Sequence, residues 1–213
     1  MPKLKPDTHR ARREHILDAA QICFARSGFH RTTMQDICKE AVVSPGALYV
    51  YFGSKEDLIA GIVERDRAKL AGELAALAEA PDLLAALSKL GEHYTVEEPQ
   101  HKRLLCVEIG LESTRNEAVG ELFRSVDKFC HDSFIKLFDR AKRDGRISPE
   151  HDLDTIATVL SVIGDGMFWR RAVDPNFDAK AVMPVLTGIL SNLLNPVSAP
   201  DETIRSKASE TAQ

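Results

Sequence analysis

Apolar residues recur at helical spacing along most of the chain. Near the N-terminus, four of them fall at i, i+4, i+7 and i+8, the spacing of one buried helix face: Ile16, Ala20, Cys23 and Phe24. Gly28 follows this stretch, at the position where a helix commonly ends. No segment alternates cleanly between apolar and polar residues, so we expect no β-sheet. The chain is therefore predicted to be all-α, with about nine helices.

The same spacing, together with capping residues, places the remaining helices. Two short helices lie within 33–52, and longer ones are expected at about 54–79, 83–94, 101–114, 117–144, 154–172 and 178–194. The helix at 54–79 begins at the capping-box pattern Ser-Lys-Glu-Asp and would be about 39 Å long at about 1.5 Å per residue. The polar stretch 95–100 is predicted to be a loop. Residues 1–8 are expected to form a flexible arm, and residues 196–213 a disordered tail.

Two capping residues mark the pair of short helices. The side chain of Thr33 can cap a helix whose apolar residues Ile37 and Ala41 are four apart. Ser44 can cap a second helix, in which Pro45 occupies the first turn and lacks only an N–H that no helix bond needs. Two short helices with one buried face each, joined by a few residues, are typical of a helix-turn-helix motif.

Three segments of this region carry a family resemblance. They read Thr-Thr-Met-x-Asp-Ile at 32–37, Val-Ser-x-Gly-x-Leu-Tyr-x-Tyr-Phe at 43–52 and Ser-Lys-Glu-Asp-Leu at 54–58. In this order they resemble the DNA-binding domain of the TetR/AcrR (tetracycline repressor-like) regulators. The resemblance implies an all-helical, two-fold homodimer that binds a near-palindromic DNA operator and releases it when a small-molecule effector fills the C-terminal domain. The expected division is a DNA-binding helix-turn-helix domain at 1–55, a ligand-binding and dimerisation domain at 56–195 and a tail at 196–213.

The residues expected to contact DNA lie on and beside the second short helix. Small residues let the backbone approach a surface closely, and tyrosine hydroxyls can reach phosphate oxygens. Matched to the family pattern, Tyr49, Tyr51 and Lys55 fall at its usual phosphate-contacting positions. Gln35 carries an amide that can pair with adenine, at a family position that can reach bases. The full predicted set is Thr33, Gln35, Ser44, Pro45, Gly46, Ala47, Tyr49, Tyr51 and Lys55.

Plainer alternatives stay open for several of these roles. Lys55 could be a solvated lysine and Gln35 a surface glutamine. Three arginines near the N-terminus could reach phosphates or a minor groove, or could form only a loose basic arm: Arg10, Arg12 and Arg13. The sequence also departs from the family pattern at Val42, where the family usually has glycine in the turn. A β-branched residue disfavours the left-handed conformation, so either the turn is built differently or it carries strain.

The C-terminal half offers candidate ligand and dimer residues but no motif. The ligand candidates lie on the helices that usually enclose the ligand in this family: His93, Tyr94, Arg103, Cys106, Phe129, Phe134, Met167 and Trp169. Ordinary packing is the alternative for each. Trp169 could line an apolar cavity while Arg170 or Arg171 meets an acid group of the ligand. The wide apolar faces of the last two helices predict a partner helix pair, through Ile156, Leu160, Ile163, Val182, Leu186 and Ile189.

Charge is unevenly distributed along the chain. The 213 residues carry a net charge of −4, but residues 1–55 hold nine Lys/Arg and five Asp/Glu, a balance of +4, and the remainder holds 19 and 27, a balance of −8. A basic head on an acidic body favours a phosphate-binding end, with chance asymmetry as the alternative.

Composition narrows the function classes. The four cysteines show no C-x-x-C spacing, so buried thiols are expected rather than disulfides or metal ligands. The apolar runs are too short to span a bilayer and the N-terminus is no signal peptide, so a cytoplasmic protein without membrane contact is expected. No nucleophile motif, phosphate loop or metal-ligand spacing occurs, so we expect neither an enzyme nor a cofactor. Two hypotheses remain: a repressor released by a small molecule, or a DNA-binding regulator controlled by a protein partner.

Overall fold

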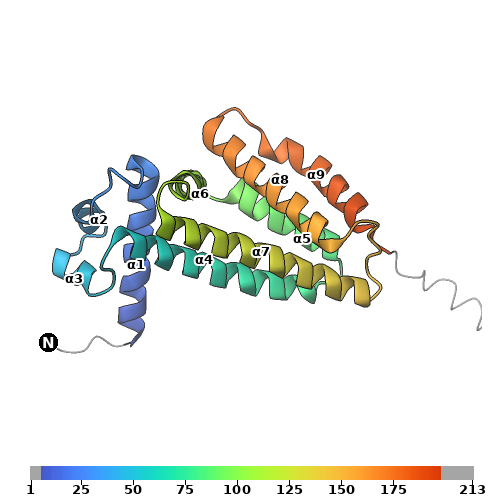
Figure 1. The fold of residues 1–213 in the computed structure, drawn as a ribbon, viewed down its shortest axis with the longest axis horizontal. Helices are drawn as coiled ribbons and strands as arrows, with labels where there is room; N and C mark the ends of the chain where they lie inside the picture. Colours follow the sequence, from blue (N-terminus) through green and yellow to red (C-terminus); the bar gives the residue numbers. More distant parts are fainter. Residues whose placement is uncertain (1–5, 198–213) are drawn as a thin grey trace, which may run out of the picture.

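The computed structural model describes residues 6–197 as a bundle of helices (Figure 1). The α-helices of this range are α1 (Pro6–Ser27), α2 (Met34–Glu40), α3 (Pro45–Tyr49), α4 (Lys55–Ala78), α5 (Leu83–Glu92), α6 (Gln100–Glu112), α7 (Glu117–Arg143), α8 (Leu153–Val173) and α9 (Ala179–Leu194). A short π-helix, η1 (His93–Glu97), separates α5 from α6. The described residues form no strand, only an isolated antiparallel bridge between Ile147 and Pro196. The all-α prediction is confirmed.

Three predicted segments differ from the observed ones. The stretch predicted as a loop at 95–100 begins in η1, because α5 widens into a π turn in which the Glu98 N–H donates to the His93 carbonyl at 3.0 Å. The chain stays ordered past residue 196, since the Val197 N–H donates to the Arg146 carbonyl at 2.9 Å. Residues 6–8 of the predicted arm belong to α1. The first five residues of that arm, and the tail from residue 198, lie outside the described residues.

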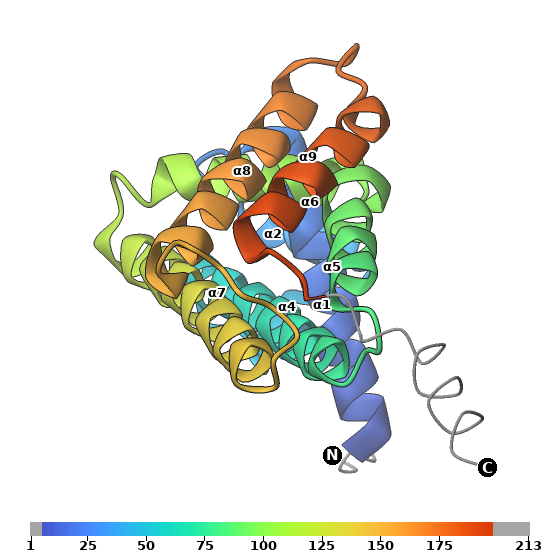
Figure 2. The same cartoon turned by 90° about the vertical axis from the view of Figure 1, so that its right-hand side faces the viewer.

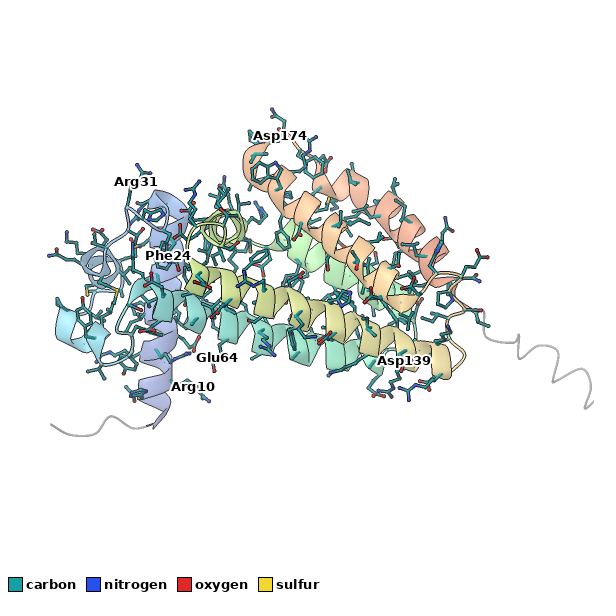
Figure 3. All side chains as sticks on the ribbon, viewed as in Figure 1. Arg10, Phe24, Arg31, Glu64, Asp139 and Asp174 are labelled. Carbon is teal, nitrogen blue, oxygen red and sulfur yellow. The ribbon has the colours of Figure 1, made fainter. Side chains whose placement is uncertain are left out.

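The N-terminal head consists of α1, α2 and α3, closed by the first turns of α4 (Figure 1). Phe24, Ile37 and Leu48 come from three different helices and are almost fully buried in its centre. Figure 3 shows Phe24 in the interior, whereas Arg10 and Arg31 lie at the periphery of the head. Because the helices are short, the head depends on apolar residues of α4, which are Leu58, Ile59 and Ile62.

Helix α6 lies between the head and the body (Figure 1). Its residues Leu105 and Ile109, with Val119 of α7, belong to the same apolar cluster as Phe24 and Phe29 of the head. Head and body therefore share part of one core, so a shift of α6 is felt directly in the packing of α1.

The body is formed around two long helices. Helix α4 runs beside α7, and its 24 residues give it a length of about 36 Å at about 1.5 Å per residue. A second apolar cluster joins α4, α5, α7, α8 and α9 around Phe138 and Ile156, both fully buried. Figure 2 shows α8 and α9 side by side on the face of the body that lies away from α4.

Candidate nucleic-acid interface and body cavity

Side-chain caps build the helix-turn-helix. The Thr33 hydroxyl oxygen accepts from the Asp36 N–H at 3.1 Å, and the Asp36 carboxylate accepts from the Thr33 N–H at 3.0 Å, which completes a capping box. The Ser44 hydroxyl oxygen accepts from the Ala47 N–H at 3.2 Å. The hydrogen bonds that Thr33 donates, first from its hydroxyl and then from its backbone, hold the pKa of Asp36 below its usual value. Both predicted caps are confirmed.

The turn between α2 and α3 is a Schellman motif with valine at its left-handed position. Val42 has φ 51°, and its N–H donates to the Lys39 carbonyl at 3.2 Å. The next N–H, that of Val43, donates to the Cys38 carbonyl at 3.0 Å. The Val42 residue is 88% exposed, so no packing of its side chain offsets this conformation. The structure therefore has Val42 in the left-handed conformation, which favours a strained turn over the other alternative that the sequence left open.

Most of the predicted DNA-contacting residues belong to the exposed surface of α2, of α3 and of the residues that cap them. The exposed members are Thr33, Gln35, Ser44, Pro45, Gly46 and Tyr49, with Ala47 half-buried between them. Tyr49 is 55% exposed, and its neighbour Val50 is 72% exposed. A Cβ atom at Gly46 would meet nothing within 4 Å, so this glycine leaves room at the surface rather than relieving an internal clash. Such a surface lets backbone amides and a tyrosine hydroxyl approach phosphate oxygens.

Tyr51 lies outside this surface, contrary to expectation. Its ring packs against the core of the head, with its centroid 4.4 Å from that of the His9 ring. Its hydroxyl is buried and has no hydrogen-bond partner among the described residues. The reason is local: α3 ends at Tyr49, so Tyr51 follows the helix and its side chain turns back towards α1.

Lys55 is also held within the head. Its ammonium group donates to the Phe29 carbonyl at 2.6 Å and to the His30 carbonyl at 3.4 Å, and it lies 4.3 Å from the centroid of the Phe29 ring. Lys55 therefore anchors the loop after α1, a role that differs from both the phosphate contact and the solvated lysine that the sequence suggested. Arg13 is engaged in a comparable way, with one guanidinium nitrogen 3.0 Å from the Glu64 carboxylate.

Two glutamates of α6 reach the loop that Lys55 holds. The Glu108 carboxylate accepts from the Phe29 N–H at 2.7 Å. The Glu112 carboxylate, only 2% exposed, lies 2.8 Å from Nε2 of His30. The sequence alone does not reveal either residue, because an isolated glutamate on a helix has the same pattern as a solvated one until its neighbours are known. Together they fasten the body to the base of the head.

The body contains a cavity of about 560 Å³ between α5, α6, α7, α8 and α9. This volume lies within the usual range of ligand sites, about 300–1,000 Å³. Its lining is mostly apolar and includes five of the predicted ligand residues: Tyr94, Cys106, Phe134, Met167 and Trp169. Cys106 keeps accessible surface although its thiol is enclosed by protein atoms, because it borders this cavity.

The other three predicted ligand residues do not line the cavity. His93 instead faces α4, with Nε2 3.0 Å from the Lys69 ammonium group. Phe129 lies beneath Arg67, whose guanidinium carbon is 4.4 Å from the ring centroid. Both residues sit at helix positions that point away from the cavity, a direction that helix membership alone does not reveal.

The arginines near the cavity are bound to backbone carbonyls. Arg103 is buried and donates to the Glu98 carbonyl. Arg171, which the sequence suggested as a partner for an acid group of the ligand, donates to the carbonyls of Thr95 and Val96 in η1. These arginines hold the π-helix in place, and neither lines the cavity.

Ionisable groups of the cavity wall are shifted towards their neutral forms. Burial raises the pKa of the Cys106 and Cys130 thiols to about 11, so both stay protonated at neutral pH. Burial, and then the hydrogen bond that its hydroxyl donates to Glu73 at 2.6 Å, raise the pKa of Tyr94. Burial and the neighbouring Asp127 raise the pKa of Asp165.

The predicted dimer residues fall on different faces of α8 and α9. Ile156 is fully buried in the second apolar cluster and cannot contact a partner, which corrects that expectation. Leu160, Ile163, Leu186 and Ile189 line the cavity, and Val182 is half-buried. The exposed apolar residues of these helices are Val162, Trp169, Val173, Val185 and Ile189. Both helices are apolar around most of their circumference, so periodicity could not identify the outward face.

The described residues offer neither a metal site nor a membrane-spanning helix. Within 6–197, no His, Cys, Asp and Glu side chains gather in a group that could hold a metal ion. No helix in the same range combines the length and the apolar character needed to cross a bilayer.

Comparison with known proteins gives one consistent result. The family model described as bacterial regulatory proteins of the tetR family matches residues 16–62. The HTH-type transcriptional regulator UidR of Escherichia coli K12 is 32% identical over 148 residues, which cover 68% of this chain and 73% of UidR. The solved structure of Salmonella enterica GusR matches with a TM-score of 0.75 at 31% identity, covering 91% of this chain and 100% of GusR. The SmeT–triclosan complex, whose protein is a repressor from Stenotrophomonas maltophilia, matches with a TM-score of 0.71 at 24% identity, covering 90% and 98%; at this identity the likeness shows the fold alone.

Proposed function

The chain belongs to the TetR family of bacterial transcriptional regulators, and on this premise we propose that it is a homodimeric repressor which a small-molecule effector releases from its operator. The observation that carries the proposal is the apolar cavity of about 560 Å³ in the body. A protein of the same fold, SmeT, forms a complex with triclosan, which supports a small molecule as the signal. A cavity of this size favours that signal over the alternative, a protein partner.

The DNA-binding role is assigned to the exposed surface of α2 and α3, within a head that spans about residues 1–55. In this proposal Tyr49 and the capped first turns at Thr33 and Ser44 meet phosphates, while Gln35 reaches a base edge. Pro45, Gly46 and Ala47 allow close approach of the backbone. Tyr51 and Lys55 act indirectly in this proposal. Tyr51 packs against α1 behind α3, and Lys55 holds the loop that follows α1.

The dimer is assigned to α8 and α9, through the exposed residues Val162, Val185 and Ile189 rather than the buried Ile156. Their helices lie on the side of the body that Figure 2 shows away from α4. A two-fold pair of such faces would match a near-palindromic operator, whose half-sites are about 34–36 Å apart along the DNA.

Coupling between the cavity and the head runs through α6 in this proposal. An effector that displaces α6 also displaces Glu108 and Glu112, and with them the loop at Phe29 and His30. The same displacement tilts α4, and a helix about 36 Å long converts a tilt of a few degrees into a shift of a few ångströms at its end. Such a shift changes the spacing of two heads without any contact between effector and DNA.

The test is a reciprocal titration. An operator is first selected from a random duplex library, and an effector is identified by thermal shift of the protein without DNA. The effector is then titrated into free protein and into protein saturated with operator. Linkage requires weaker effector binding in the second titration, by the same factor by which the effector weakens operator binding.

The matched variant for this test is Glu108→Gln. It should leave both separate affinities nearly unchanged and reduce the coupling factor, because the amide oxygen of glutamine accepts from the Phe29 N–H without the charge that strengthens the bond. Equal effector affinities with and without operator in the unmodified protein would refute the effector-released repressor and support control by a protein partner.

A further inference from the structure

The charged groups in the cavity lining are all of one sign. Among the described residues that line it, the side chains with a formal charge at neutral pH are Asp127 of α7 and Asp165 of α8. No lysine, arginine or histidine of the described chain is part of the lining. The two carboxylates lie close enough for the charge of Asp127 to disfavour ionisation of Asp165.

Three arginines near the cavity are bound to other partners. Arg171 and Arg103 donate to backbone carbonyls of the η1 region, as described above. Arg67 lies on the Phe129 ring, outside the lining. None of these side chains offers its cation to a molecule inside the cavity, so an anionic ligand would meet two carboxylates and no counter-charge.

Neighbouring carboxylates contribute to the raised pKa of both cavity thiols. After burial, the charges of Asp66, Glu98 and Asp165 raise the pKa of Cys106, and only Lys102 lowers it. At Cys130, Asp127 and Asp165 raise the pKa and only Arg67 lowers it. At both points of the wall, acidic neighbours outnumber basic ones.

The rest of the lining suits an apolar body with a delocalised charge. Aromatic side chains from α7, α8 and η1 contribute to it, namely Tyr94, Phe123, Phe134, Phe168 and Trp169. Aromatic faces attract cations, most strongly when the cation is removed from water. The volume of about 560 Å³ accommodates a molecule with several rings.

We propose that the effector of this regulator is an apolar organic cation, with Asp127 and Asp165 as its counter-charges. This inference rests on the proposed function, because it names the chemical class of the effector for the same cavity. It replaces the acid group that the sequence suggested opposite Arg170 or Arg171.

The test compares two probes of nearly the same shape and opposite charge, the tetraphenylphosphonium cation and the tetraphenylborate anion. Trp169 is the single tryptophan of the chain and lines the cavity, so quenching of its fluorescence reports binding. The cation should bind at least about tenfold more tightly than the anion. Asp165→Asn should weaken cation binding by about tenfold, and Asp127→Asn/Asp165→Asn should abolish the preference for the cation.

The control is Asp139→Asn, which removes one carboxylate from the far end of α7, where Asp139 pairs with Arg143 (Figure 3). It should leave both affinities unchanged. No binding of the cation, equal or tighter binding of the anion, or a preference that survives the double substitution would each overturn the assignment.

An operator-release assay with the same probes separates the two proposals. Binding of the cation without release of operator would refute the effector-released repressor and leave the charge class standing. Release of operator by uncharged compounds, with no preference for the cation, would refute the charge class and leave the effector-released repressor standing.

Discussion

Replacement of Val42 by glycine should stabilise the protein. Val42 holds φ 51° at the left-handed position of the Schellman turn, with 88% of its surface exposed. A non-glycine residue in that conformation costs about 1–2 kcal/mol, whereas glycine adopts it freely. Glycine also lowers the stability by about 0.5–1 kcal/mol, because it increases the entropy of the unfolded chain. The expected net gain is therefore about 1 kcal/mol.

A gain of this size should raise the melting temperature by about 2–4 °C for a chain of this length. The matched control is Val50→Gly, because Val50 is also exposed but has φ −65°. There, glycine brings only its entropic cost, so this variant should melt at a lower temperature than the unmodified protein. Calorimetry on the unmodified protein and the two variants measures the three melting temperatures. If Val42→Gly melts no higher than the unmodified protein, the turn carries no strain.

Three further changes test the head and the dimer. Lys55→Met should lower the free energy of unfolding by about 1–2 kcal/mol, because the hydrogen bonds to the Phe29 and His30 carbonyls are lost; unchanged stability with a smaller salt dependence of DNA binding would instead make Lys55 a phosphate contact. Asp36→Asn should destabilise the protein at neutral pH. Because the folded state lowers the pKa of Asp36, its contribution is present above the unfolded pKa of about 4 and is lost as pH falls through the lower folded pKa, so urea unfolding of the two proteins should converge as the pH falls below about 4. Val185→Glu should give monomers in sedimentation; a variant that stays dimeric would place the interface elsewhere.

Features with short-range causes could be predicted from the sequence. Thr33 and Ser44 each accept a hydrogen bond from an N–H three residues later, so the pattern of residue types is enough to find them. Gly28 was placed at the end of α1, and its φ of 78° confirms the left-handed cap. The helices were found within a few residues of their observed bounds for the same reason.

Features with distant causes could not be predicted. Lys55 contacts a carbonyl 26 residues earlier in the chain, and Glu108 an N–H 79 residues away. No local pattern encodes such a partner. Ile156 was misplaced because α8 is apolar on several faces, and the choice between core, cavity and partner depends on where α7 and α9 lie.

The rim of the cavity has a consequence for how the regulator would respond to its own abundance. Ile189 lines the cavity and is also 42% exposed on the face that we propose for the partner subunit. In the proposed dimer, a molecule that settles in the cavity would therefore touch a residue of the surface on which the subunits meet. Occupancy and association become linked equilibria, so the concentration of effector needed for half-saturation should vary with the concentration of the protein. A cell that makes more of this regulator would change its sensitivity as well as its amount.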